Sequence, residues 1–153
     1  MFATSLKQNS HLMEDFHVNW PAVVVAALVP MIVGMVWYHP RVMGSIWMKA
    51  NGFTEEYLRE GNKAVMYGGA LVLAFMLALF LMLNVTGFGQ EDPQFHTFKH
   101  GVGHATLLTL LVLLPVMGTN AIFEKRSRTG VLVNLGYWWV TLSIAMGILS
   151  AWR

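Results

Sequence analysis

The sequence predicts an all-α integral membrane protein, a bundle of four transmembrane helices with a short interfacial helix in the first cytoplasmic loop. Two observations lead to this fold class. Of the 153 residues, 56% are apolar and only 12% are charged, about half the charged share of soluble domains. Four stretches also lack Asp, Glu, Lys and Arg, and each is long enough as a helix to cross a hydrocarbon core. They are Trp20–Tyr38, Ala64–Val85, Gly101–Phe123 and Gly130–Trp152.

The end of the first helix and the segment after it carry local signals. Pro40 should end the helix just after Trp37 and Tyr38, an aromatic pair typical of the membrane interface. Apolar residues then recur at helical spacing between two basic residues, which predicts the short interfacial helix. These apolar residues are Val42, Met43, Ile46 and Trp47.

The next two helices have predicted boundaries and kinks. Gly87 and Gly89 should end the second helix, and Asp92 followed by Pro93 is typical of the start of the third. Prolines inside a span should kink it, and membrane helices tolerate this when neighbours satisfy the freed carbonyls. Such prolines occur at positions 30 and 115.

The chain divides into a polar outer tail over residues 1–18 and a transmembrane domain over residues 19–153. The basic residues predict how this chain is oriented in the membrane. The loops after the first and third helices hold seven Lys and Arg, and the opposite side holds three. By the positive-inside rule, those two loops are cytoplasmic and both termini lie outside the bacterial inner membrane.

Short motifs follow one another along nearly the whole chain. They are Asn19-Trp20, Trp37-Tyr38-x-Pro40, Trp47-Met48-Lys49, Gly52-Phe53-Thr54-Glu55-Glu56, Pro115, Asn120, Phe123-Glu124-Lys125-Arg126-Ser127, Asn134-x-Gly136-Tyr137-Trp138 and Trp152. In order and spacing, over roughly residues 19–152, they resemble the bacterial membrane family catalogued as domain of unknown function 1761. The resemblance implies a small membrane protein of about four helices, and it implies no activity.

Histidines are the first candidate site. His96, His100 and His104 lie at i, i+4 and i+8, so they share one face if a single helix holds them all. A helical pair at i and i+4 can chelate a metal ion, and His11 and His17 fall on the same outer side. This set would suit a divalent transition metal such as Zn²⁺, Cu²⁺ or Ni²⁺. The favoured alternative is that interfacial histidines bond headgroups, water or backbone carbonyls.

Polar residues inside the last two spans are the second candidate site. Asn120 and Glu124 are four residues apart on the third helix, and Asn134 and Tyr137 share a face of the fourth. They could line a path for a solute or hold helices together, and the second interpretation is favoured. A stripe of small residues also predicts close helix contact, within the bundle or across a dimer. It consists of Ser143, Gly147 and Ala151.

The inventory argues against a soluble-type enzyme and against nucleic-acid binding. There is no cysteine, phosphate-binding loop, dinucleotide-binding glycine motif or nucleophile elbow, and the ten Lys and Arg are scattered. We therefore expect a lipid-embedded protein that self-associates as a homo-oligomer or acts as an accessory to a membrane-protein partner. The alternative is a transporter or channel for a small solute, a proton or a divalent metal ion, with the outer histidines as its entry site. A membrane-embedded metalloenzyme is the third interpretation.

Overall fold

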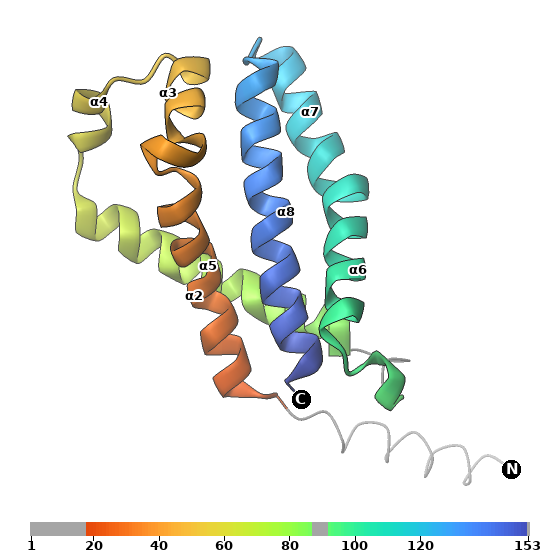
Figure 1. The fold of residues 1–153 in the computed structure, drawn as a ribbon. Helices are drawn as coiled ribbons and strands as arrows, with labels where there is room; N and C mark the ends of the chain where they lie inside the picture. Colours follow the sequence, from red (N-terminus) through yellow and green to blue (C-terminus); the bar gives the residue numbers. More distant parts are fainter. Residues whose placement is uncertain (1–17, 87–91, 153) are drawn as a thin grey trace, which may run out of the picture.

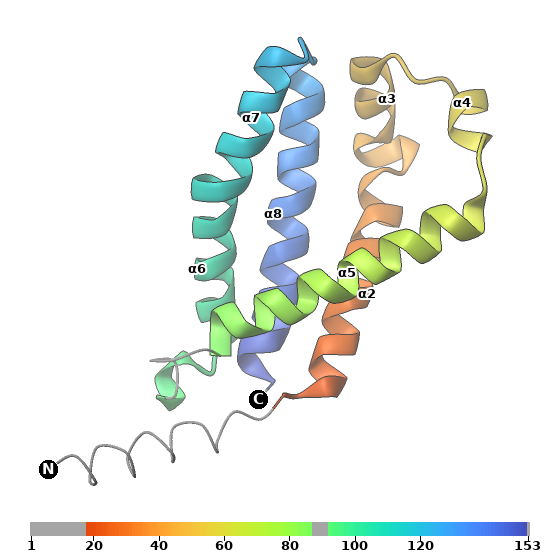
Figure 2. The same ribbon diagram turned by 180° about the vertical axis from the view of Figure 1, so that it is seen from behind.

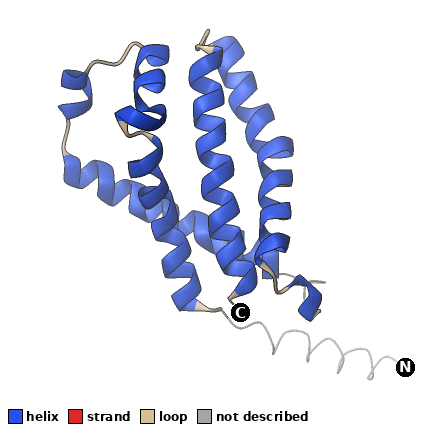
Figure 3. Cartoon of the chain, viewed as in Figure 1, coloured by secondary structure: helices blue, strands red, loops and turns tan. Residues whose placement is uncertain are grey.

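The structure is a computed structural model that describes residues 18–86 and 92–152. Within these ranges the chain forms helices and loops and no strand (Figure 3). Four helical segments are long and apolar enough to cross a membrane, which confirms the predicted fold class. They are α2 (Trp20–Trp37), α5 (Lys63–Thr86), the continuous segment made of α6 (Phe98–Leu108), η3 (Thr109–Leu113) and α7 (Leu114–Phe123), and α8 (Arg128–Ala151).

Helix α8 is the centre of the bundle. It lies between α2 and the α6–α7 segment, and its most extensive packing is with α6 (Figure 1). Helix α5 crosses α2 and α8 obliquely, behind them in Figure 1 and in front of them in Figure 2. We call the end that holds α3 (Ser45–Asn51), α4 (Glu55–Arg59) and the turn between α7 and α8 the connector end. The opposite end, where α2 begins and α8 finishes, is the terminal end.

The buried core lies in the terminal half. It draws on the first half of α2, the second half of α5, α6 and the second half of α8. Both α2 and α5 bury alanines, and small side chains let two helices approach closely in a membrane. These alanines are Ala22, Ala26, Ala27, Ala74 and Ala78. Toward the connector end α5 leaves the bundle, and no residue of its segment 63–73 is buried.

The two prolines inside the spans have different local effects. α2 continues as a regular α-helix through Pro30. Pro115 is preceded by the π-helical segment η3. Proline removes a backbone N–H and its ring crowds the carbonyl one turn earlier, so a wider turn before it relieves the clash.

The first helix ends where the sequence predicts. α2 stops at Trp37, with Tyr38 as its cap, and η1 (Pro40–Gly44) and α3 follow as the predicted short helix. This segment extends the line of α2 beside α8 (Figure 1). A Cβ at Gly44 would collide with the Tyr38 carbonyl, so the tight junction needs glycine there. Gly87 and Gly89, the predicted end of the second helix, lie outside the described residues.

The third helix begins later than predicted. Asp92 does cap a helix, since its Oδ1 accepts from the Gln94 amide at 2.9 Å, but this helix is only the short 3-10 turn η2 (Pro93–Phe95). Thr97 then takes an extended backbone, and its hydroxyl accepts from the His100 amide at 3.2 Å. This second N-cap competes with the first, and it starts α6 at Phe98.

Candidate functional site at the connector end

Two sequence motifs that lie far apart in the chain meet between α2 and α8. The indole N–H of Trp37 donates to the Val133 carbonyl at 3.1 Å, and the Tyr38 hydroxyl donates to Asn134 Oδ1 at 2.9 Å. A Cβ at Gly136 would lie 3.0 Å from the Trp37 ring, so glycine lets the indole approach α8. These contacts join the Trp-Tyr-x-Pro and Asn-x-Gly-Tyr-Trp motifs into one seam.

Tyr137 extends this seam toward the middle of the bundle. Its hydroxyl donates to the Pro30 carbonyl at 2.9 Å, and its ring lies 3.7 Å from where a Cβ on Gly34 would stand. Asn134 and Tyr137, two of the four predicted polar-path residues, therefore both bond α8 to α2. A bond of this kind between membrane helices is typically worth about 0.6–2 kcal/mol.

A row of aromatic rings continues from the seam to α4. Ring centroids are separated by 5.1 Å from Tyr137 to Tyr38, and by 4.9 Å from Tyr38 to Trp47. Phe53 follows Trp47 at 5.1 Å, and Tyr57 of α4 stacks on Phe53 at 5.0 Å. Contacts of this type contribute about 0.5–1.5 kcal/mol each beyond burial. The row therefore packs α3 and α4 against α8 at the connector end, where the aliphatic core is absent.

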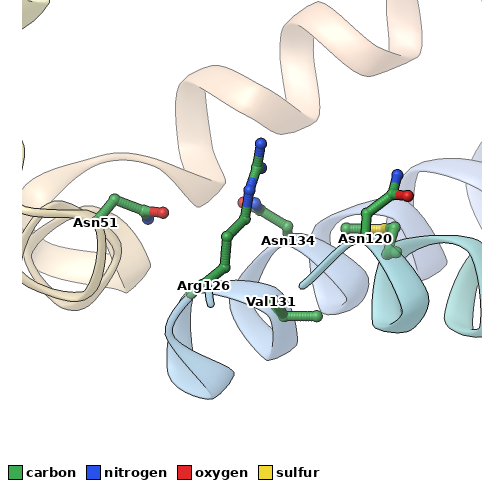
Figure 4. Close-up of a pocket in the computed structure, with 7 residues that line it drawn as sticks. Asn51, Asn120, Arg126, Val131 and Asn134 are labelled. Atoms are coloured by element: carbon green, nitrogen blue, oxygen red, sulfur yellow. The ribbon is translucent and has the colours of Figure 1, made fainter. Parts of the chain in front are cut away.

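A small pocket opens beside the seam. Its volume is about 90 Å³, and α3, α7, α8 and the α7–α8 turn all contribute to its walls. The side chains of Asn51, Asn120, Arg126 and Asn134 gather around it (Figure 4). The remaining walls come from Met117, Gly130 and Val131.

Asn120 and Glu124, the other two predicted polar-path residues, have different neighbours. Asn120 lines the pocket, whereas the carboxylate of Glu124 pairs with the Nε of Arg126. The sequence argument missed Asn51 and Arg126 as pocket residues. Arg126 does stand in one of the motifs quoted above, but nothing in the pattern around Asn51 marks it.

The histidines lie at the terminal end, away from the pocket. The rings of His100 and His104 are 4.5 Å apart, and His104 Nδ1 is 2.9 Å from Asn84 Oδ1 on α5. Phe95 lies against His100, with ring centroids 5.0 Å apart. His96 caps η2, before α6 begins, so the shared helical face expected for three histidines holds only two.

The five-histidine metal set stays a prediction. Of its members the structure brings together His100 and His104, while His11 and His17 lie outside the described residues. Over residues 18–86 and 92–152, no three His, Asp or Glu side chains gather as a metal site would require.

Gly147, the middle residue of the stripe of small residues on α8, contacts α6 of the same chain. A Cβ at Gly147 would collide with the Phe98 ring, and one at Gly101 would collide with the backbone of Met146. Of the two arrangements that the sequence allowed, Gly147 therefore takes part in packing within the bundle.

The family model described as Protein of unknown function (DUF1761) matches residues 21–150. The chain belongs to this family. The matched range contains the seam, the pocket and the histidine pair, and it confirms the resemblance drawn from the motifs. No curated protein and no solved structure matches the chain. Because the family carries no described activity, function has to be argued from the geometry.

Proposed function

We propose that the protein is a self-associating membrane helix bundle, in which a second copy packs on the first half of α5. The observation that carries this proposal is a stripe on α5 that is buried in the terminal half and uncovered in the connector half. The buried part consists of Ala74, Ala78, Leu81 and Val85.

The same helical spacing extends the stripe toward the start of α5. Counting back from Ala78, steps of four, three and four residues lead to Ala74, Leu71 and Tyr67. Steps of three and four keep residues on one face of a helix. Leu71 is 40% exposed and Tyr67 60% exposed, because α5 diverges from the other helices here (Figure 2). Other helices of the chain therefore bury only the second half of this stripe and leave its first half uncovered.

Small residues on the uncovered half of α5 favour contact with another helix. Gly68 and Gly69 have nothing within 4 Å of a Cβ position, so packing within the chain does not require glycine at either. Glycine inside a helix costs about 1 kcal/mol relative to alanine, whereas small residues spaced as Ala64 and Gly68 allow two membrane helices to approach closely.

A second copy is the simplest occupant. Two copies inserted in the same orientation are related by a twofold axis along the membrane normal, and such an interface presents the same patch from both chains. Residues near the axis then face their own counterparts. Leu71 of one copy should lie close to Leu71 of the other.

Cross-linking tests this arrangement cleanly, since the natural chain has no cysteine. We expect Leu71→Cys to form a disulfide-linked dimer on oxidation in membranes, and Leu73→Cys, on another face of α5, to form far less. Gly68→Leu should reduce the dimer fraction of the purified protein. Gly103→Leu is the matched control, because Gly103 also has nothing within 4 Å of its Cβ position. A monomer at every concentration, or equal cross-linking at both positions, would contradict the proposal.

The orientation in the membrane belongs to the same proposal. Seven Lys and Arg lie in residues 41–63 and 125–128, at the connector end, against three elsewhere in the chain. This excess supports a cytoplasmic connector end and outer termini in a bacterial inner membrane. Single cysteines introduced as Ser5→Cys and Arg128→Cys should react with an impermeant thiol reagent from opposite sides. Labelling of both cysteines from the same side would contradict this arrangement.

A transporter or channel for a small solute, a proton or a divalent metal ion is the second candidate. It is favoured by the contact between His104 and Asn84, which places an ionisable side chain between α5 and α6 within two predicted spans. Flux of protons or Zn²⁺ into liposomes that contain the protein should then fall in His104→Leu. Absence of flux in the natural chain would remove this candidate.

A further inference from the structure

The pocket beside the seam is lined by three amide side chains and one guanidinium. The Oδ1 of Asn134 already accepts a hydrogen bond from the Tyr38 hydroxyl. The amide nitrogen of Asn134 can therefore donate a hydrogen bond to a ligand in the pocket. Asn51 is held in place because its Nδ2 donates to the Trp47 carbonyl at 2.7 Å. A Cβ at Gly130 would lie 3.1 Å from that nitrogen, so glycine lets Asn51 stand close to α8.

Arg126 brings a positive charge to the same pocket. Glu124 contacts its Nε, which leaves the two terminal guanidinium nitrogens for another acceptor. Figure 4 shows the guanidinium beside Asn134, between Asn51 and Asn120 in this view. Among the described residues, those that line the pocket include no carboxylate, and positions 124–128 hold three basic residues against the single acid Glu124. The local charge therefore favours an anion.

The size of the pocket limits the ligand. Its volume is only about 90 Å³. Pockets for drug-sized ligands are usually about 300–1,000 Å³. The pocket therefore suits a single small charged group.

From these observations we infer that the pocket binds an oxoanion, a phosphate or carboxylate group, through the guanidinium of Arg126 and the amides of Asn134 and Asn120. A planar guanidinium with two terminal NH₂ groups matches the spacing of the oxygens of such an anion. Its charge-assisted hydrogen bonds are stronger than neutral ones, and the two amides add neutral hydrogen bonds to them. This site is separate from the uncovered half of α5, so the failure of either proposal leaves the other standing.

Two sources could supply the oxoanion. One is a soluble ion such as inorganic phosphate, and the other is the phosphate of an anionic lipid at the membrane surface. Both offer the same chemistry to Arg126, and the experiment has one arm for each.

In the first arm, the thermal midpoint of the purified full-length protein is measured in neutral detergent with sodium phosphate or with sodium chloride at equal ionic strength. A ligand that binds only the folded state raises the midpoint with its concentration. In the second arm, native mass spectrometry follows the retention of phosphatidylglycerol against phosphatidylcholine added to the same detergent.

Arg126→Gln and Arg128→Gln form the matched pair of variants. Each removes one positive charge from the same turn, but only Arg126 lines the pocket. We expect Arg126→Gln to weaken binding of the effective probe about tenfold or more, as loss of a charge-assisted hydrogen bond does, and Arg128→Gln to leave it within about twofold. Asn120→Ala, at an exposed position, should weaken binding without affecting the fold.

Glu124→Gln tests the electrostatics in the opposite direction. Glutamine can still accept a hydrogen bond from the Nε of Arg126, but the competing negative charge is gone. Binding of the oxoanion should therefore become tighter. A weaker affinity in this variant would mean that the anion does not share Arg126 with Glu124.

Each result decides the inference. A midpoint that rises with phosphate, and no longer does so in Arg126→Gln, supports a soluble oxoanion. Selective retention of phosphatidylglycerol that is lost in Arg126→Gln and kept in Arg128→Gln supports a lipid phosphate. Binding of neither probe, or an equal loss in the two arginine variants, would overturn it.

Discussion

The two halves of the bundle are held together in different ways. In the terminal half all four spans converge, and the buried residues are mostly alanine, leucine, valine and methionine. In the connector half α5 has left the bundle, and α2, α3 and α8 are joined by side-chain hydrogen bonds and aromatic rings. The terminal half therefore provides stability, because a close-packed core leaves no room for a ligand. The connector half is packed less closely, and it contains both the pocket and the uncovered face of α5.

The candidate residues divide between the same two halves. The histidines attract attention in the sequence, but His100 and His104 stand beside the packed core, and the described partner of His104 is an asparagine. Asn134 and Tyr137 are less conspicuous in the sequence, yet they form the contact between α2 and α8. Three experiments, each with its control, test this comparison.

The largest effect should come from Gly101→Ala in the terminal half. The added Cβ would overlap the backbone of Met146, which cannot rotate away as a side chain can. We expect a loss of about 3 kcal/mol in the free energy of unfolding, at the upper end for overpacked sites. Gly103→Ala, in the same helix with open space around it, should instead gain up to about 1 kcal/mol. Thermal unfolding in detergent compares the two, and equal midpoints would show that α6 and α8 are not so tightly packed.

An intermediate effect should come from the seam in the connector half. Tyr38→Phe and Asn134→Leu each break the same hydrogen bond, so their effects on stability should not add. A double-mutant cycle should give a coupling of about 0.6–1.7 kcal/mol, the range found between membrane helices. Pairing Tyr38→Phe with His104→Leu, at the opposite end, is the control and should be additive. A coupling near zero in the first cycle would mean that the bond adds nothing to the junction.

The smallest effect should come from the histidine pair. His100→Leu with His104→Leu should lower the thermal midpoint less than the seam variants, because the hydrogen bond between His104 and Asn84 is at an exposed position. Two histidines one turn apart can still hold a divalent metal ion weakly, and binding needs neutral imidazoles. Calorimetric titration with Zn²⁺, Ni²⁺ and Cu²⁺ should therefore show weak binding to the natural chain and no binding to the double variant. Tight binding that survives in the variant would place the metal elsewhere.

Much of the fold could be predicted from local sequence. The four spans follow from the lengths of the charge-free runs, because lipid leaves the backbone no partner outside a helix. The end of α2 before Pro40 and the capping role of Asp92 follow from the chemistry of one or two residues. The later start of α6 at Phe98 depends on which of two nearby caps prevails, and the pattern alone favoured the wrong one.

Only the tertiary structure decided which residues meet. Apolar side chains cover every face of a membrane helix, so their pattern along the chain does not show that α5 crosses obliquely or that its stripe is half uncovered. The same limit applies to polar residues. Asn51 and Arg126 gather with Asn134 because α3 packs beside α8 and the α7–α8 turn closes over them, and these contacts join segments that are remote in sequence. The sequence by itself determined the helices, whereas the pocket exists only through the packing between them.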